Sequence, residues 1–141
     1  MGVPINYWAV IASAIIAMVL GFLWYGPIFG KAWIKLMGFT TESMDDAKKK
    51  GMTKSYIIMI VTTLVMAFVF AHSLEFGIAY TNTTGVAAGL TAAFWNWLGF
   101  IATVLTGKVL WEGKSWKLWF LDSGYYLVSL CLMGIVLAVW R

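Results

Sequence analysis

The chemistry open to this chain rests on a few polar side chains inside long apolar segments. Asp122 lies near the start of the last such segment, and Asn96 lies at the centre of the third. His72 and Glu75 lie near the end of the second. An ionisable group inside a bilayer is costly unless it has a partner, so these four residues are the first candidates for a binding or proton-transfer site.

Asp122 is the most deeply placed acid. It follows the start of its segment by about six residues, which is about 9 Å at 1.5 Å per residue. A lysine that snorkels could reach it, with Lys108, Lys117 and Lys31 in range, and Tyr126 lies one helical turn further on the same face. Two interpretations remain open: Asp122 pins helix ends together, or it forms a proton or ligand site.

His72 and Glu75 share one helix face at positions i and i+3, near the outer end of their segment. They form either a proton-responsive pair or a solvated interfacial pair. Asn96 is neutral and is flanked by Trp95 and Trp97. It either forms an interhelical hydrogen bond, which selects which helix faces which, or lines a cavity together with at most one of the two tryptophans.

The sequence lacks the residues for other site chemistry. With one histidine and one cysteine, Cys131, it cannot build a usual zinc or haem site, so we expect no metal and no cofactor. No nucleophile stands beside a base, and no glycine-rich phosphate loop follows a strand. We therefore expect no catalytic residues and a protein that is not an enzyme.

Composition indicates a membrane protein. Of the 141 residues 62% are hydrophobic and only 11% are charged, against about a quarter charged in soluble domains. Four apolar segments are long enough to span a bilayer. We expect an all-α integral membrane fold, a single domain (1–141) with four transmembrane helices in an antiparallel up-down bundle, at about residues 5–25, 55–76, 86–107 and 117–140. A short interfacial helix at 28–37 and a loop at 38–54 follow the first span.

Small residues recur at helical spacing in two of these spans. They form one row in the first span and one in the third, where another helix backbone can approach closely. The first row is Ala9, Ser13, Ala17 and Gly21, and the second is Gly85, Gly89 and Ala93. We therefore expect helix packing, and a homo-oligomer, through these faces.

Basic residues lie almost entirely in two of the connections. Six lysines separate the first two spans and three separate the last two, which leaves only Arg141 of the ten basic residues. The positive-inside bias places both lysine-rich loops in the cytoplasm and both termini outside, in the cytoplasmic (inner) membrane. We expect anionic lipid headgroups, and not nucleic acid, as the partner of this charge. The expected interfacial anchors are Lys31, Trp33, Trp111, Lys114 and Trp116.

The two lysine-rich loops contain related runs. Gly30-Lys31-Ala32-Trp33 resembles Gly113-Lys114-Ser115-Trp116, which is consistent with duplicated hairpins or with two independent solutions at the same interface. In the first loop Pro27 ends the helix just inside the aromatic belt. Trp24 and Tyr25 should therefore lie at the depth of Asp122 and cover it.

Three stretches of the sequence resemble a known family. They are the run from Trp24-Tyr25-Gly26-Pro27 to Trp33, the run Trp111-Glu112-Gly113-Lys114-Ser115-Trp116-Lys117-Leu118, and the run Asp122-Ser123-Gly124-Tyr125-Tyr126. It is the domain of unknown function 1761 family of small prokaryotic membrane proteins. The resemblance covers nearly the whole chain and implies four helices and a prokaryotic source. It assigns no activity, substrate or residue role.

Three functions are compatible with the sequence. The first is a non-enzymatic, oligomerising bundle that binds lipid or a hydrophobic small molecule. The second is a small transporter or channel that uses Asp122 and Asn96 with His72 and Glu75. The third is a lipid-modifying membrane enzyme, for which the sequence offers no acid–base geometry.

Overall fold

The structure, a computed structural model, describes residues 2–141, and these contain helices and no strand. Four helical stretches are long and apolar enough to cross a membrane, as the sequence predicts. The helices are α1 (Tyr7–Leu23), α2 (Gly30–Met37), α3 (Thr41–Lys50), α4 (Thr53–Thr81), α5 (Gly85–Trp97), α6 (Thr103–Leu110) and α7 (Trp116–Val139), with π-helical segments η1 (Trp24–Ile28) and η2 (Leu98–Ala102).

The first span starts at a cap and ends at a break. The Asn6 side chain accepts hydrogen bonds from the amides of Trp8 and Ala9, which satisfies free donors of the first turn of α1. Pro27 lacks an amide hydrogen, and the chain is kinked within η1, where Gly26 has a non-helical backbone with φ −106° and ψ −105°. Across this kink the Phe29 amide donates to the Trp24 carbonyl at 2.8 Å. The span therefore covers Tyr7–Ile28 instead of residues 5–25.

The bend at η1 requires a glycine three residues after Pro27. A Cβ at Gly30 would lie 2.7 Å from the Tyr25 carbonyl oxygen, so any larger residue would push the two turns apart. After this contact α2 starts, and it ends at Gly38, whose φ of 78° is left-handed. The short helix lies where the sequence predicts an interfacial segment, at 28–37.

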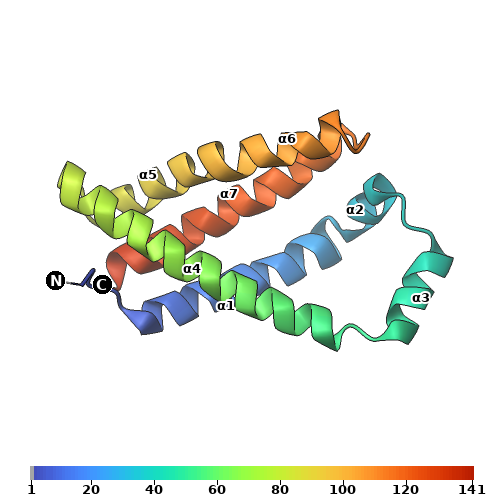
Figure 1. Cartoon of the computed structure of the whole chain (residues 1–141), viewed down its shortest axis with the longest axis horizontal. Helices are drawn as coiled ribbons and strands as arrows, with labels where there is room; N and C mark the ends of the chain where they lie inside the picture. The colour runs from blue at the N-terminus through green and yellow to red at the C-terminus, as the bar shows by residue number, and fades with distance from the viewer. Residues whose placement is uncertain (1) are drawn as a thin grey trace.

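The connection expected as a loop at 38–54 contains a helix. Thr40 and Ser43 form a reciprocal capping box, and Lys48, Lys49 and Lys50 occupy the last turn, where cations favour the carbonyl end of a helix. These local signals form α3. The helix lies beyond the lysine-rich end of the bundle and runs across the direction of α4 (Figure 1).

The second span is longer than the sequence predicts, because it continues beyond residue 76 through residues 77–81. No proline interrupts this stretch, and the helix ends only at Asn82, which adopts a left-handed φ of 56°. The third span covers Gly85–Leu110 and contains the π segment η2, and the fourth ends at Val139.

The centre of the fold is α7, which packs against α1 on one side and α5 on the other (Figure 1). Its closest neighbour is α5, where Gly89 faces Gly134. A Cβ on Gly89 would overlap the carbonyl of Gly134, and a Cβ on Gly134 would lie 2.5 Å from the Gly89 carbonyl oxygen. The two backbones touch because neither residue carries a side chain.

The helix α4 packs against the bundle through only part of its length. Its buried residues all lie beyond position 66, where it crosses α1 and α7 (Figure 1): Ala67, Phe70, Ala71, Leu74, Glu75 and Ile78. Residues 53–62, which we call the free half of α4, are all exposed. The bundle therefore has four packed helices at the end with the chain termini and opens at the lysine-rich end.

The glycine contact between α5 and α7 makes a direct prediction. Replacing Gly89 with alanine should destabilise the protein by about 1–3 kcal/mol, since the methyl group forces two backbones apart. Gly77→Ala in α4 is the matched control, because nothing lies within 4 Å of its Cβ position. Unfolding in detergent micelles measures both variants, and equal stability of the two would contradict the contact.

Candidate functional site

The Asp122 carboxylate is held from two other helices. The Tyr25 hydroxyl, from η1, donates to Oδ1 at 3.0 Å, and the Lys108 ammonium, from α6, lies 3.1 Å from Oδ2. The Asp122 side chain is 5% exposed and that of Lys108 is 40% exposed, so the pair joins a buried anion to a cation that reaches the surface. We call Tyr25, Lys108 and Asp122 the carboxylate cluster.

Two indoles fix the backbone on either side of Asp122. Trp24 donates from Nε1 to the Leu121 carbonyl at 3.1 Å, and Trp97 donates to the Ser123 carbonyl at 2.8 Å. Trp24 also lies over Gly124, whose Cβ position is 3.5 Å from the indole ring. Trp24 and Tyr25 therefore lie at the depth of Asp122 and contact α7.

A second tyrosine of α7, Tyr125, also enters this region. Tyr125 donates from its hydroxyl to the Ala17 carbonyl at 3.0 Å and packs edge-on against Tyr25, with ring centroids 5.2 Å apart. Tyr126 packs against Tyr125 at 5.0 Å. Spacing within α7 did not identify Tyr125, because the contacts of its ring and hydroxyl come from α1 and η1.

The π segment η2 aligns α5 and α6 with α7. Nineteen residues separate Gly89 from Lys108, which in a regular helix turns their side chains about 100° apart. The extra residue of a π turn removes about that rotation. Gly89 and Lys108 thus face α7 together, one at Gly134 and the other at Asp122.

Asn96 joins α5 to α4, and its hydrogen-bond partners are not members of the carboxylate cluster. Its Nδ2 donates to Ser73 Oγ at 2.9 Å and to the Ala92 carbonyl at 2.8 Å. This is the interhelical hydrogen bond expected for a central asparagine.

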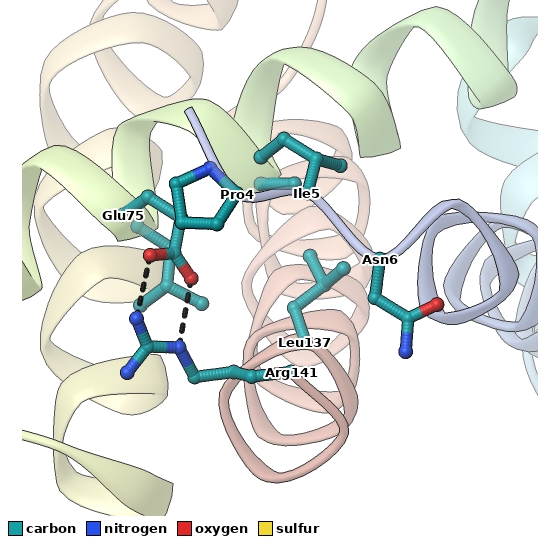
Figure 2. A pocket seen from close by; sticks show the side chains of 8 residues that line it. Pro4, Ile5, Asn6, Glu75, Leu137 and Arg141 are labelled. Atoms are coloured by element: carbon teal, nitrogen blue, oxygen red, sulfur yellow. Dashed lines mark hydrogen bonds and ion pairs between the residues drawn. The ribbon is translucent and has the colours of Figure 1, made fainter. Parts of the chain in front are cut away.

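His72 and Glu75 have separate partners. The two Glu75 oxygens accept from Arg141 Nε at 2.9 Å and Nη2 at 2.7 Å, a bidentate ion pair (Figure 2). His72 has its Nδ1 at 2.9 Å from the Phe68 carbonyl and packs between Phe68 and Phe76. Close to the ion pair, Asn6 donates to the Trp140 carbonyl at 3.1 Å, which joins the two ends of the chain.

Two spaces, a cavity and an open groove, adjoin this ion pair. A cavity of about 10 Å³ lies between Glu75, Arg141, Asn6 and Leu137, and an open groove of about 320 Å³ lies beside Glu75 and Arg141 under residues 2–4. The smaller space is comparable to a single water molecule. Neither adjoins the carboxylate cluster, which is at the opposite end of α7.

The anchor residues gather at the lysine-rich end. Lys114, from the connection between α6 and α7, donates to the Met37 carbonyl at the end of α2 at 3.2 Å, which ties the two loops together. Trp33 packs against Tyr25 with ring centroids 5.5 Å apart. Lys31, Trp111 and Trp116 are exposed.

The small-residue rows lie mainly inside the bundle. In α1, Ala9, Ser13 and Ala17 are buried, and Gly21 lies under the Tyr125 hydroxyl. In α5, Gly89 and Ala93 are buried, whereas Gly85 is half-buried with a left-handed φ of 63° at the start of the helix. These rows therefore pack against helices of the same chain.

One family model covers nearly the whole chain. The model of the family described as "protein of unknown function (DUF1761)" matches residues 8–138. The chain belongs to this family. The match spans η1, η2 and the whole carboxylate cluster of this DUF1761 protein. Comparison with curated proteins and with solved structures gave no significant match.

In this DUF1761 protein the Asp122 side chain bonds only to groups of other helical segments of the same chain, within the residues that the structure describes. Both Asp122 oxygens have partners, and within residues 2–141 no three His, Cys, Asp or Glu side chains lie close enough to hold a metal ion. Sequence reasoning missed Tyr125, Ser73 and the pairing of Glu75 with Arg141. The last had a usable signal, because Arg141 is the one cation expected at the same end as Glu75.

Because Lys108 is partly exposed and Asp122 is buried, removing Lys108 should destabilise the protein more than neutralising Asp122. Lys108→Leu should cost about 3 kcal/mol of stability, because it leaves a buried carboxylate with one neutral donor. Asp122→Asn should cost less, about 1–2 kcal/mol, since the amide still accepts from Tyr25 and Lys108 can extend to water. The free energy of unfolding in micelles measures both.

The double variant tests the coupling directly. Lys108→Leu combined with Asp122→Asn should lose less stability than the sum of the two single changes. Lys117→Leu, which removes an exposed lysine of the same end, should be close to neutral. Additive losses in the double variant would show that the pair is not a unit.

Proposed function

We propose that this protein is a non-enzymatic, homo-oligomeric membrane bundle that holds a lipid or another hydrophobic molecule with an anionic head beside the free half of α4. The observation that carries the proposal is the burial pattern of α4. From Tyr56 to Val61 six successive large apolar residues are exposed, although a helix packed on one side would bury about two of them.

The binding surface proposed for this molecule is the inward row of the free half. The buried face of α4 beyond residue 66, continued backwards in steps of three and four, runs through Leu64, Ile60, Ile57 and Tyr56. This row continues the face that α4 buries against its neighbours, along the part of α4 that diverges from α1 (Figure 1). An apolar chain fits such a surface because it needs no hydrogen-bond partners.

The charge at this end supports an anionic head group. Lys48, Lys49, Lys50 and Lys54 lie where α3 joins α4, directly beside the free half. Lysines at a membrane surface each attract anionic lipid by about 1 kcal/mol. The positive-inside bias supports a cytoplasmic position for this end, with both termini outside.

The contacts of the polar residues favour this function over transport. Asp122, Asn96 and Glu75 each bond to a different partner, Lys108, Ser73 and Arg141 respectively. A transport pathway needs polar groups that face one another along a route, and these face three separate helix contacts. Acid–base catalysis on a lipid is disfavoured for the same reason, since Asp122 has no free oxygen.

Retention of lipid tests the proposal. Native mass spectrometry of protein extracted from anionic vesicles should detect one or more bound anionic lipids. Ile60→Trp should remove most of them by filling the inward row, whereas Val65→Trp should not, because Val65 lies on the opposite face of the same helix. A wild-type protein without bound lipid, or equal loss in both variants, would exclude this binding surface.

A further inference from the structure

We propose that α3 forms an antiparallel pair with α3 of a second copy, so that the protein is a two-fold symmetric dimer joined at its lysine-rich end. This inference deepens the homo-oligomer part of the proposed function, on which it rests, by naming the partner surface. It does not depend on the bound lipid.

The position of α3 leaves it free for a partner. Every residue of the helix is exposed except Met44, which is half-buried. The helix lies beyond the lysine-rich end of the bundle and runs across the direction of α4 (Figure 1). Six of its ten residues are charged, so we place it at the membrane surface, outside the hydrocarbon, where charged side chains can interact.

The order of charges in α3 would make two copies complementary if a two-fold axis relates them. Glu42, Asp45 and Asp46 occupy its first half, and Lys48, Lys49 and Lys50 end it. A two-fold axis along the membrane normal keeps the spans of both copies upright but reverses any helix that lies in the membrane plane. The acidic half of each α3 then lies beside the basic half of the other.

The free half of α4 gives the second, independent observation. The outward face of α4 carries a row of β-branched residues, Ile58, Val61, Val65 and Val69, which are between 51% and 59% exposed. The helix starts three residues after α3 ends, so pairing of α3 brings the outward rows of two copies together. Apolar rows alone give little specificity in lipid, and the charged helices supply it.

The order of charges in α3 also suits its own helix dipole, which favours acids at the start and lysines at the end. Dimerisation and helix stability respond differently when the charges are exchanged. A chain with lysines first and acids last opposes the dipole, yet it restores complementary pairs between two copies. Charge exchange therefore separates the two explanations.

Energy transfer between fluorophore-labelled copies in lipid vesicles tests the dimer. One chain carries Glu42→Lys, Asp45→Lys and Asp46→Lys, and the other carries Lys48→Glu, Lys49→Glu and Lys50→Glu. Each chain alone should associate at least about tenfold more weakly than the wild type, because opposite-charge neighbours across the interface become like-charge neighbours. A mixture of both chains should recover the wild-type transfer, and so should one chain that carries all six changes.

Glu112→Lys is the matched control, since it changes the charge of the other lysine-rich connection and should leave association unchanged. A mixture that transfers no better than either chain alone would overturn the inference, as would monomeric wild-type protein at all dilutions in lipid. Bound lipid is measured on the same samples. Loss of dimer with lipid retained supports a separate interface, and loss of lipid with the dimer retained would contradict only the proposed lipid surface.

Discussion

A carboxylate buried beside a bilayer needs a partner for each oxygen, and this requirement shapes the lysine-rich end of the protein. Asp122 obtains one partner, Tyr25, from the first span and another, Lys108, from the third. The first is available because a kink at Gly26 and Pro27 ends the regular helix next to Tyr25. The second is aligned with α7 because η2 inserts a π turn into the third span. Both departures from a regular helix therefore serve one buried charge.

The opposite end is held together by different physics. There the backbones of α5 and α7 touch at Gly89 and Gly134, and small residues of α1 are buried against their neighbours. Apolar side chains gain little by leaving lipid for a helix interface, so close backbone approach supplies the packing. The Glu75 and Arg141 pair closes this end.

The sequence was sufficient for the parts of the structure that depend on local composition. Four spans follow from hydropathy, and the depth of Trp24 and Tyr25 beside Asp122 follows from helix rise and the position of Pro27. It was insufficient where two helices must meet at a particular angle. The contacts of Tyr125, the partner Ser73 for Asn96 and the free half of α4 all depend on interhelical geometry, which no spacing rule within one helix contains.

The contacts at the two ends of the bundle explain why α4 diverges from the other spans at the lysine-rich end. The packing of α4 ends near Ala67, and the contacts that fasten the lysine-rich end join only the first, third and fourth spans through Asp122. The free half of α4 carries no charged group other than Lys54 and so has no anion or second cation to offer that cluster. The exposed isoleucines and valines of this half are therefore covered from outside the chain, and the lysines of α3 adjoin the same half. This is why we propose an anionic lipid and a second copy as its partners.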